Sequence, residues 1–170
     1  AFLLSRAEQV DNQRVAVPLI ERFATAANDN AAKVGVPVSG SDLSRKGGEM
    51  LWFLRVFPYL DASTTVPLLK AAMTQAKDQE AKRWWLMALG MTGDKTVGSE
   101  LRAIVESKTE DVSVRALALM AYGYALEEEA LPLLRSYEND PTPGPNPYAP
   151  SPLRNRSSST TAKILGHKLR

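Results

Sequence analysis

Residues 111–123, DVSVRALALMAYG, decide the fold, because a similar pattern occurs at residues 78–90, DQEAKRWWLMALG. The two stretches are separated by a period of 33 residues, and one further period back lies a weaker copy at residues 45–57. In the two clearer copies an aspartate comes first, apolar residues follow at helical spacing, and a glycine comes last. Repeats of this length are typical of stacked helical units, so we expect an all-α fold.

The segments between the copies match as well. Val66-Pro67-Leu68-Leu69-Lys70 is almost identical in character to Leu131-Pro132-Leu133-Leu134-Arg135. Each copy therefore predicts a pair of helices, the first with a proline near its start. A single pair cannot bury its own apolar face, so neighbouring pairs must stack on one another.

The ends of the second helices are predicted from residue type. We expect Asp78 and Asp111 to accept hydrogen bonds from the free N–H groups at the helix starts. We expect Gly90 and Gly123 to end these helices, because glycine adopts the left-handed cap conformation at little cost.

The pattern of Asp111, Val114, Arg115 and Ala118, followed by Leu-Pro-Leu-Leu at residues 131–134, resembles the HEAT repeat. It is also similar to the short bacterial HEAT-like form named after phycobilisome lyases. The resemblance implies an α–α superhelix, or solenoid, with Asp111 and Arg115 in structural roles. It covers roughly residues 46–140 and implies about three helix pairs, at residues 46–77, 78–110 and 111–140, with extra helices before them.

The two ends of the chain differ from the repeats. Residues 1–140 are predicted to form the solenoid domain, in which Pro18 begins a second N-terminal helix and residues 28–48 form a long loop. Residues 141–152 contain six of the 11 prolines, which favours an extended conformation. We therefore expect residues 141–170 to be an extended tail, with room for one or two helical turns at residues 162–169.

The net charge of +2 is unevenly distributed. Residues 141–170 contain five basic side chains and no acidic one, whereas residues 1–140 contain 16 basic and 19 acidic side chains. An acidic body argues against nucleic-acid binding by the repeats, although the basic tail permits weak, salt-sensitive binding.

Several classes of function are disfavoured by composition. The chain has no cysteine and only one histidine, His167, so thiol chemistry, zinc ribbons and multi-histidine metal sites have no basis. No apolar run is long enough for a membrane span. We expect a non-catalytic protein that needs no cofactor.

The predicted function is protein–protein interaction, as a scaffold or subunit of a larger assembly. We expect Trp52 and Trp85 to be core residues, and Trp84 either to lie on the surface or to pack between repeats. Two alternatives remain open: nucleic-acid binding, by a HEAT-like DNA glycosylase type or through the tail, and a lyase-type subunit for chromophore attachment. The candidate partner-binding residues are Arg55, Arg83, Trp84, Arg154, Arg156, Lys163, Lys168 and Arg170.

Overall fold

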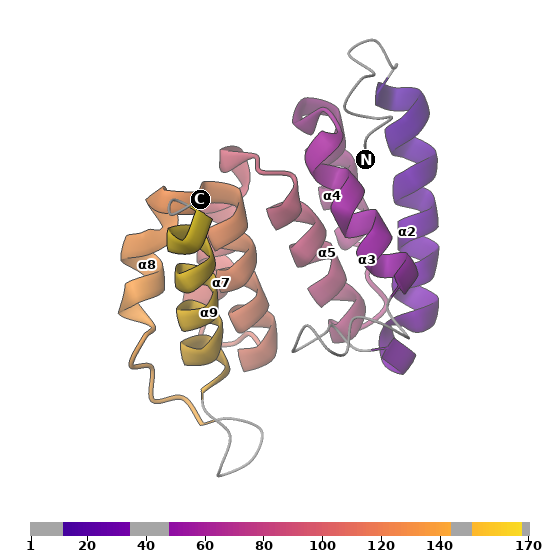
Figure 1. Ribbon diagram of the computed structural model, residues 1–170. Coiled ribbons are helices and arrows are strands. Elements are labelled where there is room, and N and C mark those ends of the chain that lie inside the picture. The colour runs from indigo at the N-terminus through magenta and orange to yellow at the C-terminus, as the bar shows by residue number, and fades with distance from the viewer. Residues whose placement is uncertain (1–11, 35–47, 144–150, 168–170) are drawn as a thin grey trace. The chain divides into compact units, whose positions relative to one another are not determined.

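The computed structural model describes residues 12–34, 48–143 and 151–167. Helices make up all the regular structure in these ranges, and none of the described residues lies in a strand (Figure 1). The predicted all-α class is thus confirmed. The chain divides into two compact units, residues 1–92 (unit 1) and residues 93–170 (unit 2).

Unit 1 is built around its first described helix. The helices of this unit are α2 (Asn12–Val34), α3 (Gly48–Val56), the short 3-10 helix η2 (Phe57–Tyr59), α4 (Ala62–Met73) and α5 (Gln79–Met91). Helix α2 packs against α3, α4 and α5. It is also tied to the connection before α5, because the backbone N–H of Lys77 donates to the Asn28 side chain at 3.1 Å.

The centre of unit 1 is an aromatic cluster around Phe23. The ring of Phe23 meets those of Phe53, Phe57 and Trp85 edge to face, with centroid distances of 5.7, 5.3 and 4.8 Å. All four side chains are buried. Edge-to-face pairs at such distances stabilise a core beyond the area that they bury, so this cluster joins α2, α3, η2 and α5.

Two expectations for the N-terminal region are wrong. Pro18 lies inside α2 rather than at the start of a second helix. The helix continues to Val34, into the region predicted to be a loop, so alanines 26, 27, 31 and 32 belong to one continuous helix. The rest of the predicted loop, residues 35–47, lies outside the described residues.

Both predicted aspartate caps are confirmed. The Asp78 side chain accepts a hydrogen bond from the backbone N–H of Ala81 at 2.8 Å. The Asp111 side chain accepts from Ser113 and Val114 in the same way. Helices α5 and α7 (Val112–Leu126) therefore begin where the repeat places them.

The predicted glycine ends are wrong. Gly90 and Gly123 both lie within their helices. After α5 it is Gly93 that has a positive φ, of 69°. Gly123 instead permits close approach of another helix, because a Cβ at this position would overlap the Thr160 methyl group.

Unit 2 is built around α7. The other helices of the unit are η3 (Lys95–Val97), α6 (Gly98–Glu106), η4 (Glu127–Ala130), α8 (Leu131–Ser136) and α9 (Pro152–His167). Helix α7 packs against α6, α8 and α9, and its residues 116–123 are buried without interruption. Arg115 fastens α7 to the end of α6, because its Nε donates to the Val105 carbonyl at 2.8 Å.

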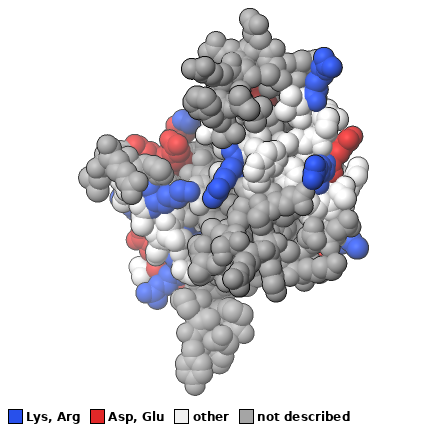
Figure 2. All heavy atoms as spheres, turned by 45° about the vertical axis from the view of Figure 1, so that its right-hand side comes forward, with Lys and Arg blue, Asp and Glu red and all other residues white. Residues whose placement is uncertain are grey.

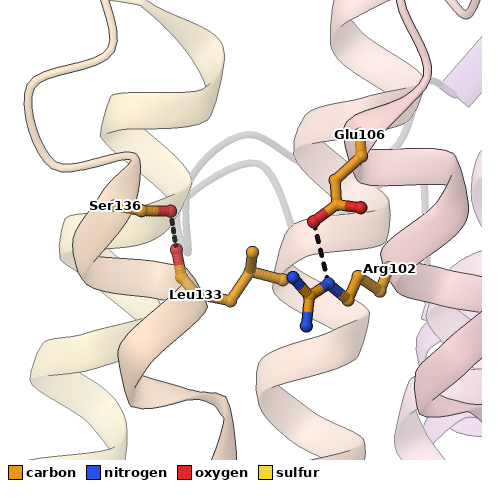
Figure 3. A network of polar contacts seen from close by, with 4 residues as sticks. All are labelled: Arg102, Glu106, Leu133 and Ser136. Atoms are coloured by element: carbon orange, nitrogen blue, oxygen red, sulfur yellow. Dashed lines mark hydrogen bonds and ion pairs between the residues drawn. The ribbon is translucent and has the colours of Figure 1, made fainter.

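The surface of unit 2 has local polar contacts on α6 and α8. The Arg102 Nε donates to a Glu106 carboxylate oxygen at 2.8 Å within α6. On α8 the Ser136 hydroxyl donates to the Leu133 carbonyl at 2.7 Å. Figure 3 shows the Leu133 side chain pointing from α8 toward the Arg102 guanidinium.

Residues 152–167 form one helix, α9. The expected extended conformation is therefore wrong for residues 152–161, and the helical turns expected from residue 162 belong to this longer helix. Pro152 suits a first helical position, and the Ser151 hydroxyl accepts from the Arg154 N–H at 3.4 Å, as a cap does. Helix α9 packs on α7 and α8, and the Ser157 hydroxyl donates to the Leu134 carbonyl at 2.6 Å. The signal in the sequence is the helical spacing of the buried side chains of α9, namely Leu153, Ser157, Thr160, Thr161 and Ile164.

The close approach of α7 and α9 predicts the effect of a methyl group. We expect Gly123→Ala to lower the free energy of unfolding by about 1–3 kcal/mol, because the added Cβ meets the Thr160 methyl group. Thr160→Ser removes that methyl group, so the loss should shrink when both changes are combined. Urea unfolding of the four chains in this cycle measures the coupling.

Gly166→Ala is the matched control, because nothing lies within 4 Å of a Cβ at that position. We expect its free energy of unfolding to stay the same or to rise by no more than about 1 kcal/mol. An equal loss for Gly123→Ala with and without Thr160→Ser would contradict the packing described.

Candidate functional site

A groove lies between α2 and α3 on the surface of unit 1. We call it the α2–α3 groove, and its volume is about 720 Å³, within the range of known ligand sites. Its lining residues are Arg14, Val15, Pro18, Leu19, Arg22, Trp52 and Phe53.

The α2 side of the groove follows from helical spacing. Arg14, Pro18 and Arg22 are each four residues apart, so they lie along one side of the helix. All three are exposed, whereas Val15 and Leu19 are half-buried between this side and the core-facing side. The floor is therefore apolar, and an arginine lies near each end.

The α3 side of the groove presents a large exposed aromatic residue. Trp52 is 54% exposed, while its neighbour Phe53 is 1% exposed. The two rings meet edge to face with centroids 5.5 Å apart, and Phe53 is part of the Phe23 cluster. The Trp52 ring therefore packs against a core residue on one side, while much of its surface remains exposed to water.

The expectation that Trp52 is a core residue is consequently wrong. The buried residues Phe53, Val56 and Phe57 define the inward face of α3 and η2, and Trp52 lies beside that face. A register difference of one residue turns a helix position by about 100°. From α3 it is therefore Phe53, not Trp52, that packs against Phe23, as Trp85 does from α5.

Positive charge borders the groove. Arg14 and Arg22 line it, and Arg55 is exposed one turn beyond Trp52 on α3. Figure 2 turns the side of Figure 1 that carries α2 toward the viewer, and its Lys and Arg side chains lie apart from one another, with uncharged surface and some Asp and Glu side chains beside them.

The predicted site residues of unit 1 fall in different places. Arg55 is exposed near the groove, and Arg83 is half-buried on α5. Trp84 is fully buried, as is Trp85. We therefore withdraw Trp84 as a surface contact, whereas the core position predicted for Trp85 is confirmed.

Two of the five predicted site residues of the tail contact other side chains of unit 2. The Arg156 guanidinium approaches the Met120 sulfur at 3.5 Å, and burial lowers the pKa of this guanidinium below its ordinary value. The Lys163 ammonium lies 4.1 Å from the centroid of the Tyr124 ring. Arg154 is exposed, and Lys168 and Arg170 lie outside the described residues.

The sequence prediction missed the α2 side of the groove. The signal is the pair Arg14 and Arg22, eight residues apart, with Val15 and Leu19 between them. By helical spacing alone, Val15 and Leu19 belong to the apolar stripe that is expected to face the core. In the structure both residues lie at the edge of the buried face of α2, where they are only half-buried.

Other kinds of site find no basis in the described part of the chain. No group of three or more His, Cys, Asp or Glu side chains there is arranged to hold a metal ion. No described helix has the length and apolar character of a membrane span. Comparisons of the chain with protein-family models, with curated proteins and with solved structures found no match.

Tryptophan fluorescence tests the exposure of Trp52. Of the three tryptophans, Trp84 and Trp85 are fully buried, so acrylamide should quench the emission of Trp52 selectively. We expect a curved Stern–Volmer plot for the wild-type chain and only weak quenching for Trp52→Phe. Strong quenching that persists in Trp52→Phe would show that a supposedly buried indole is accessible.

Proposed function

We propose that this chain is a non-catalytic protein-interaction module and that the α2–α3 groove is its binding surface. The observation that carries the proposal is the exposed Trp52 ring, which rests on buried Phe53 at the edge of an apolar groove. Tryptophan and arginine are the residues that most often dominate binding energy at protein interfaces. A rigidly supported ring also loses little conformational entropy on binding.

We further propose that the helices form HEAT-like pairs in a solenoid. Three pairs of consecutive helices pack together within their units: α4 with α5, α6 with α7, and α8 with α9. This division is shifted by one helix from the predicted repeats at residues 46–77, 78–110 and 111–140. The cap positions of Asp78 and Asp111 agree with this assignment. On this proposal α9 is the second helix of the last pair, whereas α2 and α3, which line the groove, come before the first complete pair.

Binding through the tail receives less support than binding through the groove. Arg156 and Lys163 already contact Met120 and Tyr124 within unit 2. Side chains held in this way have fewer donors left for a nucleic acid or another acidic partner. We therefore place the interaction on unit 1.

Affinity capture from native extract tests the proposed function. We expect a protein that is retained stoichiometrically by the wild-type chain to bind Trp52→Ala at least about 30-fold more weakly, as for a hot-spot residue. Quantitative mass spectrometry of the retained proteins measures the difference.

Tyr59→Ala is the matched control, because Tyr59 is 49% exposed in the same unit but does not line the groove. This variant should retain the partner as the wild-type chain does. Equal retention by the wild-type chain and by Trp52→Ala would contradict the proposal.

A further inference from the structure

We infer that the surface of α7 and α8 beneath α9 is a second binding surface, which accepts a basic amphipathic helix of a partner protein when α9 moves away. The inference goes beyond the proposed function and does not depend on the α2–α3 groove. It follows from three features of unit 2: the shape of this surface, the buried hydroxyls of α9, and the charge of the chain on either side of Pro152.

The surface beneath α9 has the form of a helix-binding site. We call it the α7–α8 surface and define it by Met120, Gly123 and Tyr124 of α7 and Leu134 of α8, each of which contacts α9. The three residues of α7 are one, three or four positions apart, so they lie on one side of the helix. Because Gly123 has no side chain, the backbone of a second helix can approach closely. The surface therefore fits a helix with small side chains where it crosses Gly123.

Helix α9 covers this surface imperfectly. The side chains of Thr160 and Thr161 are buried, and neither hydroxyl has a hydrogen-bond partner in the described part of the chain. A hydroxyl buried in this way has lost its contact with water without a replacement, which destabilises the packed helix. Threonine also has a lower helix propensity than alanine. A helix with alanine at these two positions would avoid both costs.

The sequence before α9 allows this helix to leave as a unit. Helix α8 ends at Ser136 and α9 begins at Pro152, and six prolines lie at residues 141–152. Proline interrupts helices, so α9 is not a continuation of α8 and can move away without unwinding it. Segments with few buried apolar contacts open at a lower free energy than the rest of a domain, and the large apolar side chains that α9 buries are Leu153 and Ile164.

Charge favours a basic helix on the α7–α8 surface. Residues 93–151 contain 10 acidic and five basic side chains, whereas residues 152–170 contain five basic side chains and no acidic one. The electrostatic field of unit 2 without α9 therefore attracts positive charge and repels an acidic segment or a nucleic acid. The partner segment is consequently an amphipathic helix that resembles α9 in charge but carries small apolar residues in place of Thr160 and Thr161.

A peptide-binding assay on the full-length chain tests the inference. The probe, which we call the alanine peptide, is fluorescein-labelled and has the sequence of residues 151–167 changed by Thr160→Ala and Thr161→Ala. We expect its fluorescence anisotropy to rise and saturate on titration with the chain. The unchanged peptide should bind at least about tenfold more weakly, because it has no advantage over a tethered α9 whose effective concentration is on the order of 1 mM.

A change of charge in the peptide tests the preference for a basic helix. Arg154 and Ser158 are exposed on α9, so their replacement should leave the packed side of the helix intact. We expect the alanine peptide with Arg154→Glu and Ser158→Glu to bind at least about threefold more weakly, because it brings negative charge to an acidic surface. Equal or tighter binding of this peptide would contradict the basic character of the partner.

A disulfide that holds α9 in place provides the decisive variant. A Cβ at Gly123 would lie 3.6 Å from the Thr160 Cβ, a separation typical of disulfides, and the chain has no cysteine of its own. We expect Gly123→Cys combined with Thr160→Cys to bind the alanine peptide at least about tenfold more weakly when oxidised than when reduced, because the open state is removed. The wild-type chain should bind equally under both conditions, and Trp52→Ala should bind as the wild-type chain does.

Hydrogen–deuterium exchange shows whether the peptide displaces α9. On binding of the alanine peptide we expect faster exchange in residues 152–167 of the wild-type chain, whose fragments differ from the peptide in mass, and unchanged exchange in α2 and α3.

Three results would overturn the inference. One is an alanine peptide that fails to bind the wild-type chain, or that binds the oxidised and reduced variant equally well. Another is binding without faster exchange in residues 152–167. The third is a wild-type dimer, detected by sedimentation, that disappears in the oxidised variant, because the α7–α8 surface would then bind α9 of a second copy of the chain.

Discussion

The packing of Phe23 against three other aromatic rings is the interaction on which unit 1 depends. Phe23 comes from α2, and its partners Phe53, Phe57 and Trp85 come from α3, η2 and α5. A long helix such as α2 gains most of its stability from tertiary packing rather than from propensity. The cluster therefore fixes α2 and α3 beside each other, and the groove between their outer sides is a consequence of that packing.

The same cluster explains why an aromatic ring remains exposed at the groove. Phe53 occupies the inward position on α3, so the neighbouring Trp52 is turned away from the core but stays in contact with it. Exposing so much of an indole ring leaves apolar surface in water. A partner that covers the ring would recover this free energy, which connects the core packing of unit 1 with its proposed role in binding.

Much of the fold could be predicted from the sequence, and the reasons for the failures are physical. The helical class and the caps at Asp78 and Asp111 follow from local chemistry, which a repeat makes visible. The inward face of α3 does not follow from local chemistry, because it depends on which side chain of α3 packs against Phe23 in the folded protein. Likewise, Gly123 was interpreted as a helix end, whereas its function is to admit α9. The polar composition of α9 concealed a helix held by small side chains and by the hydrogen bond from Ser157 to Leu134.

The central claim is that the partner binds in the groove between α2 and α3. Hydrogen–deuterium exchange of the full chain, measured with and without the captured partner, tests this most directly, because bound segments lose exposure of their amides. We predict slower exchange on binding in residues 12–28 and 52–57, with no matching change in α9. Slower exchange confined to residues 152–167, or unchanged exchange in α2 and α3, would contradict the claim.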